Sequence, residues 1–253
     1  PKIALRWEPN ENLMTYVSWS TGFRSGGFAA RGNSLLPPFD AEEVTAIEVG
    51  LKGMMLDDRV RLNVALYQND YADLQRTILT PGTEIAFTQS TQNAGEATIS
   101  GAEVEVSYQA TQNLIFTASW GLTDAKFDEF VGFDLDGDGS PDPDEARQLK
   151  FSQVPENTYN ASVNYSKKFA DKGYVDFRLA LRRIDDLFHD DQNLVYEPGH
   201  NIVDANISFQ PFSENWTISL FGKNLSNEDY AFEGADLGGL GANRFLFPPR
   251  TWG

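Results

Sequence analysis

The sequence predicts an all-β protein, an antiparallel up-and-down transmembrane β-barrel of which the chain forms about nine to ten strands. Three observations support this fold class. Apolar and polar residues alternate with a period of two along most of the chain, and short and long connections follow one another in turn. The polar face of the strands also carries more charge than a dry protein interior can hold.

The alternation defines the individual strands. Val60, Leu62 and Val64 fall on one face of their segment, and Arg61 and Asn63 fall on the other. No helical periodicity is present in such segments, and they reach about 10 residues, whereas the strands of soluble sandwiches are typically about 5–6 residues long. We therefore expect nine strands and the start of a tenth, at 13–24, 44–52, 59–66, 101–108, 114–123, 158–165, 174–183, 201–209, 215–223 and 250–253.

The connections between the strands are of two kinds, and every second one is long. Short polar turns are expected near 55–58, 110–112, 167–172 and 211–214. Long segments rich in Gly, Pro and Asp are expected at 25–41, 80–94, 128–150, 187–198 and 225–249. Outer-membrane barrels have this layout, with short periplasmic turns and longer extracellular loops.

The polar face of the strands favours a wide barrel with a wet or plugged interior. Unpaired charges in a dry core would cost several kcal/mol each. The apolar face carries isolated aromatic rings, several of them near strand ends, as an interfacial girdle requires. The polar residues are Arg61, Asn63, Glu103, Glu105, Asn160, Asn164, Asp176, Arg178, Arg182, Asp204 and Asn206, and the rings are Trp19, Tyr108, Trp120, Tyr159, Tyr165 and Trp216.

Composition excludes several classes of function. The chain has 253 residues with no Cys and only two His, so disulfide scaffolds, thiolate metal sites and cysteine nucleophiles are excluded. A net charge of −17 argues against nucleic acid as a partner. No apolar run is long enough for a transmembrane helix, and the chain opens at Pro1 without an initiating Met or a signal peptide.

Several stretches together resemble the C-terminal portion of TonB-dependent outer-membrane receptors. Each motif is weak alone, but their order and spacing cover essentially the whole chain. The stretches are STGFRSGGF (20–28), EVTAIEVGLKG (43–53), VRLNVALYQNDYADLQ (60–75), NAGEATISGAEVEV (93–106), FGKNLSNEDY (221–230) and FPPRTWG (247–253).

The resemblance implies a bacterial outer-membrane protein with a 22-stranded barrel around a plug. Residues 1–253 would then be the C-terminal portion of that barrel, a fragment that lacks the plug, the segment that contacts TonB and about half of the barrel. Expected partners are outer-membrane lipid, TonB, the protein's own plug domain and a small-molecule or glycan ligand. A small ten-stranded barrel is the competing interpretation, but the last strand is too short to cross an apolar band about 25 Å tall.

One acidic segment, FDLDGDGSPDPDE at 133–145, matches the calcium-loop pattern D-x-D-x-D-G-x5-E. Carboxylate and carbonyl oxygens at these spacings are the ligands of a calcium loop. Flanking helices are absent and Pro141 replaces an apolar residue, so an isolated structural Ca²⁺ loop is expected and not an EF-hand domain. The alternative is a solvated acidic loop. The expected ligands are Asp134, Asp136, Asp138, Ser140, Asp142 and Glu145.

Other candidate residues lie at strand ends and in long loops. Arg24, Arg31 and Arg244 could contact an anionic or chelated ligand. Each could instead form a structural ion pair or carry a solvated charge. Four loop aromatics could form a ligand rim or pack the loops together, and His189 with Asp190 and Asp191 could bind a metal. The aromatics are Phe28, Phe39, Tyr230 and Phe232.

The functional hypothesis is TonB-energised uptake of a scarce ligand across the outer membrane. An iron–siderophore complex is favoured, and cobalamin or an oligosaccharide are the other ligands considered. No nucleophile, base and acid occur together in a recognisable local pattern, so an enzyme is not expected. The alternatives are a passive porin-like channel and a soluble calcium-dependent carbohydrate-binding β-sandwich.

Overall fold

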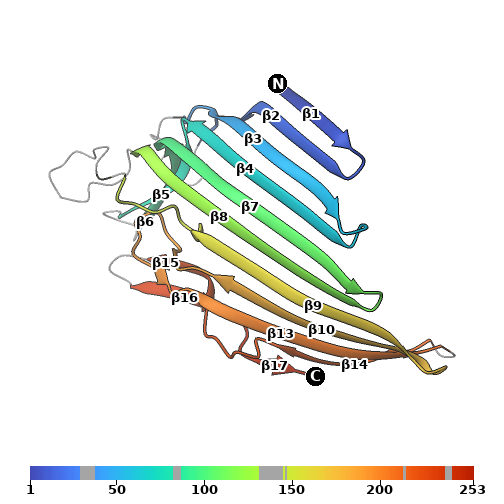
Figure 1. The fold of residues 1–253 in the computed structure, drawn as a ribbon. Coiled ribbons are helices and arrows are strands. Elements are labelled where there is room, and N and C mark those ends of the chain that lie inside the picture. The colour runs from blue at the N-terminus through green and yellow to red at the C-terminus, as the bar shows by residue number, and fades with distance from the viewer. Residues whose placement is uncertain (29–37, 82–86, 131–144, 146, 213–214, 237–240) are drawn as a thin grey trace.

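The computed structural model describes residues 1–28, 38–81, 87–130, 145, 147–212, 215–236 and 241–253, and side chains are not described for 78–90. An antiparallel sheet of 11 strands dominates it (Figure 1). The all-β, up-and-down fold class is thus confirmed. The sheet strands are β1 (Lys2–Asn10), β2 (Leu13–Arg24), β3 (Glu42–Met55), β4 (Val60–Ala72), β7 (Gly95–Thr111), β8 (Leu114–Phe130), β9 (Asn157–Phe169), β10 (Gly173–Ile184), β13 (His200–Pro211), β14 (Ile218–Lys223) and β17 (Thr251–Trp252).

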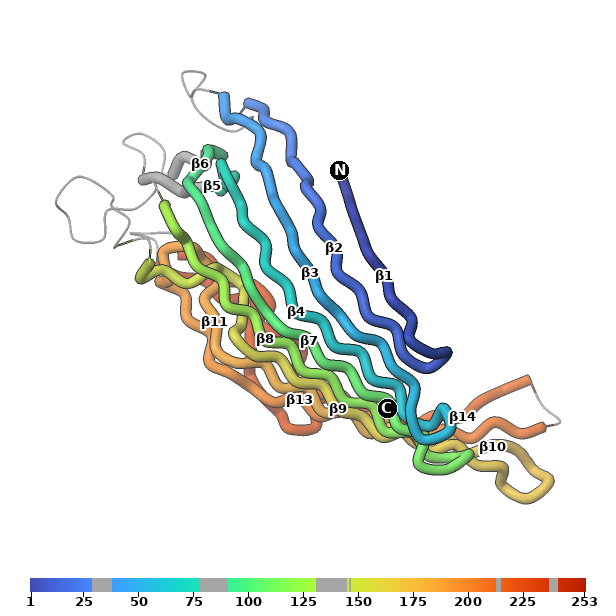
Figure 2. Tube along the Cα trace, turned by 45° about the horizontal axis from the view of Figure 1, so that its top comes forward, coloured from blue at the N-terminus to red at the C-terminus, as the bar shows by residue number. Residues whose placement is uncertain are grey.

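Each strand of the large sheet pairs with the next such strand along the chain, with β1 and β17 at the two edges. Figure 2 shows that the sheet is curved and that its strands share one tilt. No helix in the described part of the chain is long and apolar enough to cross a membrane.

The connections divide the molecule into two ends. The turn end holds the short links of β1 to β2, β3 to β4, β7 to β8, β9 to β10 and β13 to β14. At the opposite, loop end, three long connections contain small hairpins that the sequence patterns did not predict. These pair β5 (Gln75–Pro81) with β6 (Phe87–Asn93), β11 (Leu187–Phe188) with β12 (Tyr196–Glu197), and β15 (Ala231–Asp236) with β16 (Ala242–Leu246).

Strand β1 is a correction to the sequence analysis, which began its count at residue 13. Its alternating apolar pattern consists of only three residues, Ile3, Leu5 and Trp7, and it ends at Pro9. Pairing with β2, from Lys2 opposite Ser20 to Asn10 opposite Leu13, supplies what the short pattern lacks.

The outer face of the sheet is apolar and open to its surroundings. Its side chains leave large fractions of their surface exposed, for example 55% at Leu66 and 63% at Leu220. A contiguous exposed apolar surface of this extent needs a non-aqueous neighbour, and lipid provides one. Other members of this face are Ile3, Leu5, Trp7, Val17, Trp19, Ile47, Val49, Phe116, Leu179, Leu181 and Ile207.

The longest strands extend beyond the length that a membrane requires. β8 has 17 residues, whereas about 9–11 tilted residues cross a bilayer. Its outer face is apolar from Leu114 to Leu122 and then changes to Asp124, Lys126 and Asp128. The loop-end half of β8 therefore stands in water, above the apolar band.

The buried core lies at the loop end and not between two layers. It comprises Leu74, Ala94, Ala97, Phe127, Phe130, Leu149 and Phe151, all at most 6% exposed. The Phe127 ring stacks on Phe151 with centroids 4.0 Å apart and tilts against Phe130 at 4.6 Å. Residues from two long connections and from the loop-end halves of β7 and β8 thus share one apolar cluster, which holds the loop end together.

Candidate functional site

A cavity of about 510 Å³ occupies the inner, polar face of the sheet, and we call it the polar trough. Strands β4, β7, β8, β9, β10 and β13 supply its walls, because alternate residues of each strand point inward. Its polar lining is Arg61, Asn63, Glu105, Ser107, Thr117, Ser119, Asn160, Ser162, Arg178, Arg182 and Asp204.

Hydrogen bonds within and beside the trough hold part of this lining in place. Asn63 Nδ2 donates to Glu105 at 3.1 Å, and Arg178 Nη1 donates to Asn164 Oδ1 at 2.8 Å. The Thr117 and Ser162 hydroxyls lie 2.7 Å apart. The trough is therefore a surface of ordered polar groups, as expected for a wet interior.

At the loop end, a hydrogen-bond network surrounds Gln75, the first residue of β5. The Gln75 side-chain amide donates to the carbonyl of Asp40 at 2.9 Å and to that of Ser25 at 3.1 Å. Asn93 donates to the carbonyls of Asp40 and Asp73, at 3.1 and 2.8 Å. The connection after β2 is therefore fastened to the hairpin of β5 and β6.

Arg76 joins this hairpin to two further connections. Its guanidinium carbon lies 4.8 Å from the ring centroid of Phe151 and 5.7 Å from that of Phe127. Asp191 is 3.8 Å from Arg76 and accepts a hydrogen bond of 2.6 Å from Ser152. Three long connections thus meet at one arginine.

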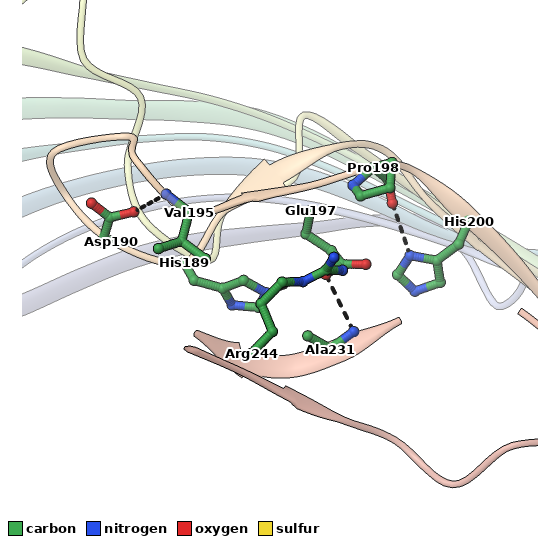
Figure 3. Close-up of polar contacts among 8 residues, drawn as sticks. All are labelled: His189, Asp190, Val195, Glu197, Pro198, His200, Ala231 and Arg244. Atoms are coloured by element: carbon green, nitrogen blue, oxygen red, sulfur yellow. Dashed lines mark hydrogen bonds and ion pairs between the residues drawn. The ribbon is translucent and has the colours of Figure 1, made fainter. Parts of the chain in front are cut away.

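A second junction, around Glu197 of β12, connects the last two small hairpins (Figure 3). Glu197 is 1% exposed, and its Oε2 accepts from the Ala231 backbone N–H at 3.2 Å and from Arg244 of β16. His189 Nε2 lies 3.6 Å from the same oxygen. A buried carboxylate is tolerated only when it is paired, and Arg244 and the Ala231 N–H supply the pairing at Oε2.

Aromatic stacking completes this junction. Tyr230 stacks between His200 at 4.5 Å and Phe247 at 4.7 Å. Tyr230 is buried and packs the loops together, which is one of the two roles considered for the loop aromatics. Phe28 and Phe232 remain exposed and are available to a rim.

The structure describes two of the three predicted ligand arginines, Arg24 and Arg244. Arg24 ends β2 and is exposed, while its carbonyl accepts from Gln75 at 3.4 Å. Arg244 pairs with Glu197, so its charge is already committed. Arg31 lies outside the described residues.

The predicted calcium ligands are almost entirely outside the described residues. Asp134, Asp136, Asp138, Ser140 and Asp142 are not described, whereas Glu145 is described and 5% exposed. The described residues His189, Asp190 and Asp191 do not form the metal site that was considered for them. Asp190 accepts from the backbone N–H groups of Leu194 and Val195, and no cluster able to hold a metal occurs among the described residues.

Sequence reasoning missed the residues that organise the loop end, namely Gln75, Arg76 and Glu197. Each lies in a long connection where period-two alternation carries no information about partners. Glu197 is recognised as an organising residue only because it is charged and buried. Burial is a property of the folded chain and cannot be read from the local sequence.

A family model described as TonB dependent receptor-like, beta-barrel matches residues 1–225. The chain belongs to this family. Its members are outer-membrane receptors and transporters and not enzymes, so the bacterial outer membrane is the location of this chain. The apolar outer face and the polar trough are the two faces that such a barrel wall needs.

Solved structures share the fold of this TonB-dependent receptor chain at low sequence identity. The ferric yersiniabactin uptake receptor FyuA from Yersinia pestis matches with a TM-score of 0.79 and 19% identity over 99% of this chain and 35% of its own. The siderophore receptor PiuA from Acinetobacter baumannii gives 0.73 and 17% over 98% and 34%. The copper transporter OprC gives 0.72 and 17% over 99% and 38%. The chain thus spans about a third of the length of these proteins.

Proposed function

We propose that this chain, residues 1–253, is the C-terminal portion of a receptor barrel that takes up a scarce ligand across the outer membrane, with energy supplied through TonB. An iron–siderophore complex is the favoured ligand, and cobalamin or an oligosaccharide are the alternatives. The observation that carries the proposal is a barrel wall with an apolar outside, a polar trough inside and long connections fastened together at one end.

The similar structures support the favoured ligand class. FyuA is described as a ferric yersiniabactin uptake receptor, PiuA as a siderophore receptor and OprC as a copper transporter. In the proposed arrangement the ligand binds at the loop end, and a plug domain fills the barrel interior. The partners are outer-membrane lipid, the plug and TonB.

Uptake of radioactive iron tests this function. We expect a deletion of the gene to abolish growth or iron uptake with at least one ferric siderophore, and a deletion of tonB in the same strain to have the same effect. Complementation with the intact gene should restore both. Uptake that persists without TonB but still needs this gene would support the passive channel instead.

A structural Ca²⁺ at 134–145 is a second proposal, and the ligand spacing supports it. Terbium luminescence of the full-length protein should show saturable binding that calcium displaces. The variant Asp134→Asn/Asp136→Asn should lose it, whereas Asp57→Asn/Asp58→Asn in a short turn should not. An absence of saturable binding below about millimolar, the weak end for such loops, would remove the proposal.

A further inference from the structure

We propose that an apolar groove on the outer face, near the turn end, binds one phospholipid with an anionic headgroup from the periplasmic leaflet of the outer membrane. An acyl chain lies in the groove, and the headgroup phosphate contacts the ammonium group of Lys167. The site is on the surface that is turned away from the barrel interior and the plug. It does not depend on which ligand is transported.

The groove has a volume of about 350 Å³ and crosses the four strands β9, β10, β13 and β14. These strands are direct neighbours in the sheet (Figure 1), so no strand from outside residues 1–253 stands between them. The volume is within the range of small-molecule sites, roughly 300–1,000 Å³. The apolar lining residues are Phe169, Val175, Ile207, Phe209, Ile218 and Leu220.

Strand register places this lining on the outer face. Val175 is four residues before Leu179, which belongs to the outer face, and alternate residues of a strand share a face. Val175 lies opposite Phe209 of β13, so the two side chains are on the same side of the sheet. The adjacent row of β10 holds Gly173, opposite Phe169, and glycine contributes no side chain to it. The groove is therefore open toward lipid.

A cation stands at the edge of the groove. Lys167 of β9 lies opposite Val175 and is exposed. Its ammonium group forms no ion pair and no hydrogen bond with any residue that the structure describes. Because Lys167 is on the outward side, the plug cannot neutralise it. An ammonium group at the end of a long apolar stem can reach the membrane surface, where lipid phosphates are the available anions.

The depth of Lys167 fits a headgroup. It is two residues from the turn-end limit of β9, at Phe169, and the short turns of outer-membrane barrels face the periplasm. Trp216, in the neighbouring turn, is exposed, and its ring centroid lies 6.4 Å from that of Phe209. Tryptophan is enriched at the level of the headgroups. The groove thus extends from the headgroup level into the apolar band, as a phospholipid does.

The charges of the nearest turn favour an anionic headgroup over a zwitterionic one. The segment from Lys167 to Lys172 contains three lysines and one carboxylate, that of Asp171. Lys168 is 3.1 Å from Asp171, so this ion pair uses the one carboxylate. Lys167 and Lys172 keep their charge and attract a lipid with a net negative charge.

Native mass spectrometry of the full-length protein tests the site, with dioleoyl phosphatidylglycerol and dioleoyl phosphatidylcholine offered in equal amounts. We expect one phosphatidylglycerol to be retained in preference to phosphatidylcholine. Lys167→Gln should reduce the retained phosphatidylglycerol at least fivefold. The matched control Lys168→Gln removes the same charge one residue away, where the ammonium group pairs with Asp171 and lies 5.3 Å from the centroid of the Phe212 ring. This control should keep the lipid.

A second pair of variants tests the groove separately from the charge. Ile207→Trp keeps the surface apolar but fills the groove, so it should also reduce the retained phosphatidylglycerol while Lys167 is intact. Leu66→Trp makes a similar change on the outer face of β4, which is separated from β9 by β7 and β8, and should have no effect.

A phosphatidylglycerol with a photoactivatable group in its acyl chain locates the lipid independently. The expected result is that cross-links concentrate on the groove residues of β10, β13 and β14. The proposal fails if the cross-links are spread evenly over the outer face. It also fails if the two lipids are retained equally, or if Lys167→Gln leaves the retention of phosphatidylglycerol unchanged.

Discussion

Glu197 shows how a single residue can decide whether two loop hairpins stay together. Its buried Oε2 has both Arg244 and a backbone N–H as donors. Removal of one partner of a buried pair leaves an uncompensated charge, which costs about 3–5 kcal/mol. Arg244 is 40% exposed, so water screens part of this interaction.

We therefore expect Arg244→Met to destabilise the junction by roughly 1–3 kcal/mol, a value reduced for solvent exposure. Glu197→Gln should cost less, since an amide oxygen can still accept from Ala231. Hydrogen exchange at the Ala231 amide measures the opening of the junction. In the double variant Glu197→Gln/Arg244→Met, the Ala231 amide should exchange more slowly than in Arg244→Met, because the buried charge is gone. Faster exchange in the double variant would contradict this account.

Phe151 tests the apolar cluster at the same scale. Truncation of a buried Phe to Ala costs about 3–5 kcal/mol. Phe151→Ala should therefore speed exchange and proteolysis across the loop end while the spanning strands stay protected. Phe28 is 80% exposed, so Phe28→Ala is the matched control, with an effect within about 0.5 kcal/mol. Global unfolding by Phe151→Ala would show that the cluster is not local.

At the scale of the strands, two tyrosines lie over glycines on the inner face. Tyr16 is paired with Gly50 across β2 and β3, and Tyr67 with Gly101 across β4 and β7. A Cβ at either glycine would overlap the partner tyrosine ring. The rings thus cover backbone that glycine leaves open, which rigidifies the strand pair.

Gly50→Ala should consequently destabilise the barrel by about 1–3 kcal/mol, because the Tyr16 ring must move. Gly53 is in the same strand, and the nearest atom to a Cβ there would be 3.8 Å away. Gly53→Ala should be neutral or slightly stabilising, by up to about 1 kcal/mol. Urea unfolding of the full-length protein in lipid vesicles compares the two, and equal losses would rule out the ring-over-glycine explanation.

The sequence predicted the spanning elements well because their pattern has a physical cause. Lipid on one face and polar surroundings on the other require apolar and polar residues to alternate with a period of two. This alternation extends over many residues and is visible in the sequence. β1 was missed because only Ile3, Leu5 and Trp7 carry the pattern before Pro9. The hairpin of β11 and β12 was missed because strands of 2 residues cannot show a period.

At the scale of the whole molecule, the candidate site was only partly predictable. Arg61, Arg178 and Arg182 were recognised as inner-face residues, since alternation assigns a face. Their convergence on one trough depends on sheet curvature and register, which alternation does not encode. Arg244 was considered a ligand contact, but its partner Glu197 lies 47 residues away in sequence and no local signal connects them.

The claim that the outer face contacts lipid can be tested with two neighbouring residues of β10. Leu179 is on the outer face and 40% exposed, while Ala180 lines the trough. An arginine facing the middle of a bilayer costs about 2–4 kcal/mol, whereas inner-face substitutions cost little. Leu179→Arg should therefore lower the free energy of unfolding of the full-length protein in vesicles by that amount, and Ala180→Arg should change it by less than about 1 kcal/mol. Equal changes in the free energy of unfolding for the two variants would contradict the assignment of Leu179 to the apolar outer face and of Ala180 to the polar inner face.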